Sequence, residues 1–194
     1  MARRLASVGY YVMLPNLYYR QGVMEIGAYL DPGVRERMVA LMNTLSIDLV
    51  MSDVRALIDF LDADAAARTG SIGVHGYCMS GQFAINARFP TRIAAAASIY
   101  GTYLVTDRPD SPHVQAHKTK AELYFACAET DPWASMEDVE TLKRSLQSSN
   151  VAAEVEVYWG AEHAFAFPSR TAYQKASAER HWERVLALYR RRLG

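Results

Sequence analysis

The sequence predicts an α/β fold in which helices flank a mostly parallel sheet, and three observations support that prediction. Short apolar runs rich in Val, Ile, Tyr and Phe are mostly unalternating, as is typical of strands buried on both faces. Between them lie stretches whose apolar residues are spaced by three and four, as on one face of a helix. No repeat or low-complexity linker divides the 194 residues. We therefore expect one domain over residues 1–194, built from right-handed βαβ units.

Five strands are expected in chain order. They cover residues 10–15, 71–76, 92–100, 121–128 and 154–159. The expected helices cover residues 46–67, 82–88, 135–148 and 172–193. Ser135 precedes two acidic residues, which is typical of a helix N-cap. The segment 19–43 does not fit the alternation, and we expect a loop and a helix there, over one end of the sheet.

Composition limits the class of partner. Hydrophobic residues make up 51% of the chain, which is enough for a packed core, and 21 Lys and Arg balance 21 Asp and Glu. That balance argues against a polybasic protein that binds nucleic acid or a membrane surface. The apolar runs are far shorter than the roughly 20 residues that span a bilayer, and the first residues lack a signal-peptide pattern. We expect a soluble, cytoplasmic protein with a small-molecule partner.

The stretch 71–81 carries the clearest chemical signal. It predicts a strand, a sharp turn and the start of a helix, with Cys78 at the tip of the turn. Such a turn admits only Gly or very small residues around the nucleophile, and Gly76, Ser80 and Gly81 occupy those positions. The N–H groups of a helix N-terminus also favour a thiolate. Cys78 is therefore a candidate nucleophile, against the alternative of a buried structural cysteine.

A nucleophile of this kind needs an acid and a histidine later in the chain. Asp131 follows the strand expected at 121–128, and His163 follows the strand expected at 154–159. Loops at the carboxyl ends of parallel strands meet at one edge of the sheet, so both can converge on Cys78. Glu129 and Glu162 remain competing carboxylates. The Met79 N–H, directly after the nucleophile, is the expected oxyanion donor.

The other cysteine and the other histidines give no indication of a second catalytic site or of a metal site. With two cysteines there is no disulfide framework, and Cys127 lies inside an apolar strand, where we expect a core residue. The remaining histidines have no spacing typical of metal ligands; they are His75, His113, His117 and His181. We expect neither a metal nor a cofactor.

In these residues the sequence resembles the dienelactone hydrolase family of the α/β-hydrolase fold. The motif GYCMSG at residues 76–81 matches that family's nucleophile motif, with Ser80 where Gly is usual. Asp131 and His163 match its acid and base, and the likeness extends through LPNLYYR at residues 14–20 to the last helix. The resemblance implies an enzyme of that type, with a triad of Cys78, Asp131 and His163.

The resemblance also implies residues that bind substrate. Arg20 matches an Arg that helps to bind the substrate carboxylate, and Tyr100 matches a Tyr near the pocket. A second carboxylate-binding Arg is replaced by Phe167, so we expect a more apolar pocket. The family has about three strands before the point where this chain starts. The third lies between the strands expected at 10–15 and 71–76, and its loop carries a Glu near the nucleophile and a second oxyanion donor. We therefore expect an N-terminally truncated sheet, or a rebuilt one.

The predicted function is hydrolysis of an ester or lactone through Cys78, His163 and Asp131, of the dienelactone hydrolase (carboxymethylenebutenolidase) type. Two alternatives remain open. One is a hydrolase of small esters or thioesters that does not accept dienelactone. The other is a catalytically inactive domain kept for interaction.

Overall fold

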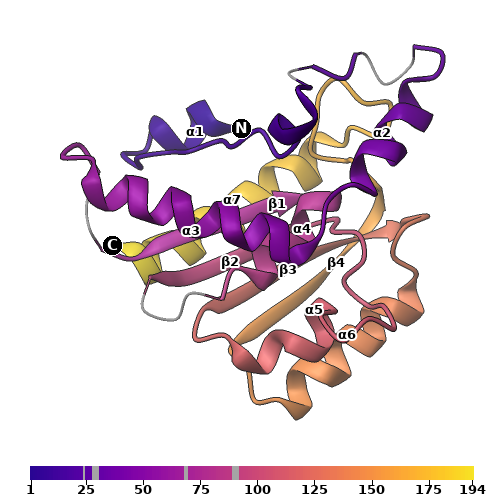
Figure 1. The fold of residues 1–194 in the computed structure, drawn as a ribbon. Helices are drawn as coiled ribbons and strands as arrows, with labels where there is room; N and C mark the ends of the chain where they lie inside the picture. The colour runs from indigo at the N-terminus through magenta and orange to yellow at the C-terminus, as the bar shows by residue number, and fades with distance from the viewer. Residues whose placement is uncertain (24, 28–30, 68–69, 89–91) are drawn as a thin grey trace. The chain divides into compact units, whose positions relative to one another are not determined.

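The computed structural model describes residues 1–23, 25–27, 31–67, 70–88 and 92–194. They belong to two compact units, Met1–Thr69 and Gly70–Gly194, and Figure 1 shows their elements in chain order. In these described ranges no helix is both long and apolar enough to cross a bilayer.

The first unit contains helices and irregular segments in its described part. The helices are α1 (Ala2–Ala6), η1 (Tyr19–Gln21), α2 (Val34–Met42) and α3 (Ile47–Ala63). Ser46 caps α3, because its side chain accepts a hydrogen bond from the Leu49 N–H. The expected loop and helix over residues 19–43 correspond to η1 and α2; residues 24 and 28–30 of that segment lie outside the described residues.

The prediction of a strand at residues 10–15 is wrong. These residues have no regular secondary structure. Leu14 is 81% exposed and Tyr11 46% exposed, and the Tyr11 hydroxyl donates a hydrogen bond to Asp64 in the same unit. An apolar run predicts an inner strand only where both of its faces are buried, and this run is not buried.

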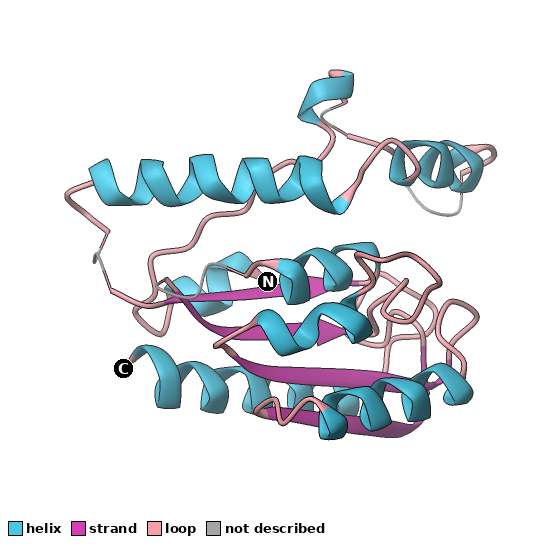
Figure 2. Cartoon of the chain, turned by 60° about the horizontal axis from the view of Figure 1, so that its bottom comes forward, coloured by secondary structure: helices cyan, strands magenta, loops and turns pink. Residues whose placement is uncertain are grey.

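The second unit is a parallel sheet of four strands flanked by helices, which confirms the predicted fold class (Figure 2). The strands are β1 (Ile72–Tyr77), β2 (Ile93–Ile99), β3 (Glu122–Thr130) and β4 (Ala153–Glu162), in the order β1-β2-β3-β4. The four expected strands of this unit are therefore present, with ends that differ by one to three residues. Neighbouring strands are consecutive in the chain and parallel, as in the βαβ units that the sequence predicts.

Helices cover both faces of this sheet. They are α4 (Met79–Asn86), α5 (Pro112–Gln115), η2 (Ala116–Lys118), α6 (Met136–Ser148) and α7 (Lys175–Leu193). Side chains alternate along a strand, so His75 and Tyr77 of β1 point to the face covered by α7, whose residues they contact. Gly76 faces α4 on the other side, where Ser80 lies against it. Figure 1 shows α7 in yellow running along the sheet.

The parallel strands end on the same side of the sheet: β1 and β2 end together, and β3 and β4 end together further along, since Ile99 pairs with Ala126 and β3 continues to Thr130. Tyr77 pairs with Ile99 across β1 and β2, and Thr130 pairs with Glu162 across β3 and β4. The residues that follow these pairs leave the same edge together. The edge therefore gathers Cys78 and the loops that carry Asp131 and His163.

The loop after β3 ends in a capped helix. The Ser135 hydroxyl accepts a hydrogen bond from the Asp138 N–H, and the Asp138 carboxylate accepts one from the Ser135 N–H. This capping box satisfies donors of the first turn of α6. It also fixes the point where the Asp131 loop stops, as sequence analysis of Ser135 predicts.

We expect Ser135→Ala to lower the free energy of unfolding by about 1 kcal/mol, because the first turn of α6 then loses a cap. Urea unfolding of the full chain measures the change. Ser135→Thr, which keeps the hydroxyl, is the control and should remain close to the wild type. Equal stability of the Ala variant and the wild type would show that the cap contributes nothing in solution.

Candidate active site

Cys78 occupies a sharp turn between β1 and α4. Its backbone has φ 53° and ψ −125°, a conformation that costs a non-glycine residue on the order of 1–3 kcal/mol. Backbone hydrogen bonds hold it there: the Cys78 N–H donates to the Ile99 carbonyl, and the Cys78 carbonyl accepts from Gly81 and Thr102. The side chain is half-buried. The turn thus has the geometry of a nucleophile elbow.

The small residues predicted around Cys78 are required by close packing. A Cβ on Gly76 would lie 2.1 Å from the Ser80 carbonyl oxygen, and one on Gly81 would lie 2.3 Å from the Ser98 hydroxyl. Ser80, where the family has Gly, bonds to the turn itself. Its hydroxyl donates to the Tyr77 carbonyl (2.8 Å) and accepts from the Tyr77 N–H (2.9 Å). The serine therefore adds two bonds to the elbow rather than disturbing it.

Asp131 and His163 form a hydrogen-bonded pair beside the elbow. The distance between His163 Nδ1 and Asp131 Oδ2 is 2.7 Å, and their side chains are 15% and 2% exposed. The backbone N–H of His163 donates to the Thr130 carbonyl, so the register of β3 and β4 places the ring next to the acid. Of the competing carboxylates, Glu129 instead accepts from the Gly160 N–H (2.5 Å), and Glu162 is exposed.

The surroundings of His163 favour its protonated form. Burial alone lowers the pKa of the ring, but hydrogen bonds to Asp131 and Cys78 and the charges of both outweigh that effect and raise the pKa to about 9. Since Nδ1 is bonded to Asp131, the ring presents Nε2 as its other nitrogen. Cys78, His163 and Asp131 therefore lie in one connected group.

Aromatic rings pack around the histidine. Tyr100 is 1% exposed, and its ring meets that of His163 edge to face, with centroids 5.1 Å apart. Phe167 contacts Tyr77 (5.3 Å) and Tyr100 (6.5 Å). Burial raises the pKa of Tyr100, so its hydroxyl stays neutral. Tyr100 and Phe167, both expected in the substrate pocket, thus lie together next to the site.

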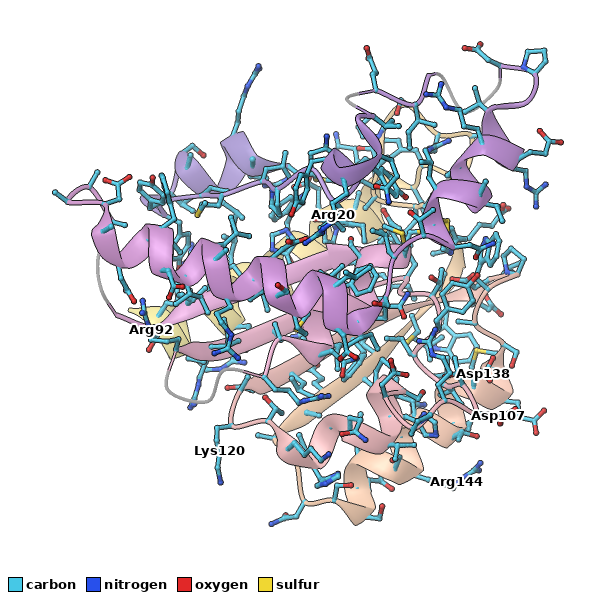
Figure 3. The ribbon with its side chains drawn as sticks, in the orientation of Figure 1. Arg20, Arg92, Asp107, Lys120, Asp138 and Arg144 are labelled. Atoms are coloured by element: carbon cyan, nitrogen blue, oxygen red, sulfur yellow. The ribbon has the colours of Figure 1, made fainter. Side chains whose placement is uncertain are left out.

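The other expected site residues are placed as follows. Met79 is the first residue of α4, directly after Cys78. Arg20, labelled in Figure 3, belongs to the first unit, where its guanidinium binds Asp53 through two hydrogen bonds of 2.7 and 2.5 Å. The Tyr19 hydroxyl also donates to Asp53.

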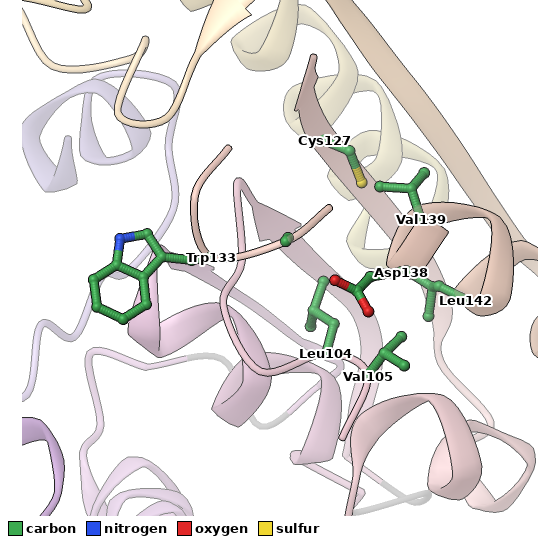
Figure 4. Close-up of a pocket in the computed structure, with 8 residues that line it drawn as sticks. Leu104, Val105, Cys127, Trp133, Asp138, Val139 and Leu142 are labelled. Atoms are coloured by element: carbon green, nitrogen blue, oxygen red, sulfur yellow. The ribbon is translucent and has the colours of Figure 1, made fainter. Parts of the chain in front are cut away.

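Cys127 lies apart from this group, in the buried core of β3. Burial raises the pKa of its thiol to about 12, which keeps it protonated. It lines a small apolar pocket with Leu104, Trp133 and Val139, shown in Figure 4. Within the part of the chain that the structure describes, no cluster of three or more His, Cys, Asp or Glu side chains could hold a metal ion.

Sequence analysis assigned no role to Tyr77 or His181, and the structure places both directly behind the elbow. The Tyr77 hydroxyl and His181 Nε2 are 3.1 Å apart. Tyr77 could have been noticed because it precedes Cys78 in the motif. His181 carries no local signal, because only the packing of α7 on the sheet brings it to β1.

Comparisons with known proteins identify the family of this chain. The family model described as "Dienelactone hydrolase family" matches residues 1–193. An Escherichia coli (strain K12) protein named "Putative carboxymethylenebutenolidase" is 30% identical over 198 residues, which cover 98% of this chain and 70% of that protein.

Solved structures show the same fold. A Klebsiella pneumoniae structure titled "Putative Dienelactone Hydrolase" has a TM-score of 0.81 at 25% identity, over 96% of this chain and 78% of that one. An α/β hydrolase from a deep-sea metagenome library has a TM-score of 0.59 at 15% identity, over 74% and 63% of the two chains. The match of the family model over nearly every residue, together with these likenesses, shows that the chain belongs to the dienelactone hydrolase family and is a hydrolase of that type.

Proposed function

We propose that this protein cleaves esters or lactones through a triad of Cys78, His163 and Asp131. The observation that carries the proposal is the His163–Asp131 bond of 2.7 Å beside a cysteine in a strained strand-to-helix turn. Each group has a distinct role in this scheme: a nucleophile, a proton carrier and a residue that orients the imidazole.

At the start of the first step the proton of the Cys78 thiol resides on His163, in agreement with the raised pKa of the ring, and the Cys78 Sγ thiolate attacks the carbonyl carbon. The Met79 N–H donates to the oxyanion, at the position directly after the nucleophile. The bond between the carbonyl carbon and the leaving oxygen then breaks, and the imidazolium gives its proton to that oxygen. The products of this step are a thioester on Cys78 and an alcohol, or one tethered hydroxy-acyl group from a lactone.

In the second step His163 takes a proton from water as the water attacks the thioester carbonyl. The carbon–sulfur bond breaks, and Cys78 is again a thiolate with the proton on His163. The Asp131 carboxylate stabilises the imidazolium in both steps, which agrees with the raised pKa of His163.

For the substrate class, we propose neutral or aromatic esters and lactones ahead of acidic ones. Phe167 and Tyr100 present aromatic rings beside the histidine, and the resemblance to the family implies an Arg at the position of Phe167. Such rings bind apolar groups better than carboxylates. Arg20 remains the candidate for recognition of a substrate carboxylate.

We expect Cys78→Ala to lower kcat for p-nitrophenyl acetate on the order of 10⁴-fold, because the proposed triad then has no nucleophile. Steady-state kinetics measures the loss. Cys127→Ala, which removes the other thiol outside the site, is the control and should keep kcat within about threefold, although a core cavity lowers its stability. Near-full turnover by Cys78→Ala would rule out this mechanism.

We expect the His163 titration to have a midpoint near pH 9 in the wild type, above the ordinary 6.5, and a lower midpoint in Asp131→Asn. The raised pKa means that the stabilisation from His163 is complete below pH 6.5 and is lost as pH rises through about 9. NMR of the ring Cε1–H signals, assigned with His163→Gln, measures the midpoint. Urea unfolding should show the wild type losing its stability advantage over Asp131→Asn across the same pH range; an unshifted midpoint would contradict the pairing.

We expect Arg20→Lys to raise KM for anionic esters more than for matched neutral esters, because Lys cannot bind a carboxylate with the paired donors of a guanidinium. Values of kcat/KM for both esters in the wild type and variant measure the difference. Equal losses on both esters would remove Arg20 from substrate recognition and leave it with its bond to Asp53.

A further inference from the structure

A buried hydrogen bond behind the elbow joins β1 to α7. The Tyr77 hydroxyl lies 3.1 Å from Nε2 of His181, which is 0% exposed. A hydrogen bond in such a setting resists displacement, because a buried polar group that loses its partner pays the full desolvation penalty. This bond therefore helps to hold the Tyr77 ring in place.

The backbone of Tyr77 is tied to the turn that holds Cys78. Both its N–H and its carbonyl bond to the Ser80 hydroxyl, two residues beyond Cys78. Tyr77 is thus held at its side-chain end by α7 and at its backbone by the elbow. A shift of Tyr77 would move the strained Cys78 peptide with it.

The same pair contacts the loop that carries His163. The His181 ring packs on Phe165, two residues after His163, with centroids 6.1 Å apart. The Tyr77 ring packs on Phe167 (5.3 Å) and on Tyr100 (5.8 Å), which itself packs on His163. Each ring contact by itself is a weak constraint on position, since edge-to-face pairs occur over a range of centroid distances of about 4.5–7 Å.

We propose that His181 is a positioning residue: through Tyr77 it sets the placement of the Cys78 elbow against the His163 loop. The inference rests on the proposed function, because placement matters only if Cys78 and His163 react together. A misplacement of about 1 Å can lower a rate on the order of 100-fold. His181 touches no reacting atom in this scheme and acts through Tyr77.

A second bond of the same chemistry provides a matched control. His75 Nδ1 lies 2.9 Å from the Tyr189 hydroxyl and also joins β1 to α7. It lies two residues earlier in β1 and about two turns further along the helix. Tyr189→Phe therefore removes a comparable bond between the same two elements, and reaches Tyr77 only through the ring contact between His75 and Tyr77 (5.4 Å).

The test compares Tyr77→Phe, His181→Phe, His181→Gln and Tyr189→Phe in the full chain. We expect Tyr77→Phe and His181→Phe to lower kcat for p-nitrophenyl acetate about 10- to 100-fold, with KM within about twofold. The double variant Tyr77→Phe/His181→Phe should lose no more than either single variant, because both remove one bond. His181→Gln can still bond to the Tyr77 hydroxyl and should restore kcat to within about fivefold of the wild type.

Two further measurements separate positioning from simple loss of stability. Urea unfolding should show similar destabilisation of Tyr77→Phe and Tyr189→Phe, while only the former lowers kcat and slows alkylation of Cys78 by iodoacetamide. If the variants at 77 and 181 lose stability but keep the wild-type kcat and alkylation rate, the pair only holds the fold and the proposal is wrong. If His181→Phe does not fold, the kcat and the alkylation rate of Tyr77→Phe alone test the proposal. Failure of the triad itself would appear separately, as turnover by Cys78→Ala.

Discussion

The strained backbone at Cys78 is the constraint on which the second unit depends. A positive φ at a cysteine persists only where the surrounding structure over-determines it. Here the turn is held by a backbone bond to β2 and by the Ser80 hydroxyl, and it closes only because Gly76 lacks a side chain. The small residues of β2 complete the arrangement, since Ser98 lies directly against Gly81. The packing of β1, β2 and α4 thus holds the Cys78 backbone in an unfavourable conformation.

The parallel arrangement of the strands brings Asp131 and His163 to the same end of the sheet as that turn. Because β3 and β4 end level, at Thr130 and Glu162, the next residue on each strand is part of the His163–Asp131 pair. No loop has to fold back for the acid to reach the histidine. The capping box at Ser135 then stops the acid loop at a defined point, which limits the positions that Asp131 can take.

The electrostatic and aromatic surroundings act on the same imidazole. Burial of His163 would by itself leave the ring neutral, and only the nearby Asp131 and Cys78 keep the proton on it. The Tyr100 ring packs edge to face on His163, and the rings of Tyr77 and Phe165 pack on Tyr100 in turn. Charge and packing thus act on the same side chain of the candidate site.

The sequence alone determined what local chemistry dictates: the alternation that makes a parallel sheet, the Gly-rich turn around Cys78, and the cap at Ser135. It failed for residues 10–15, because an apolar run does not reveal whether other elements will cover it. The sequence favoured Asp131 as the partner of His163 and left Glu129 and Glu162 as competitors. The tertiary structure decides among them, since strand register places Asp131 against the ring and Glu129 against Gly160. It alone brought His181 behind the elbow, because contacts between residues about one hundred positions apart depend on helix packing and leave no local pattern.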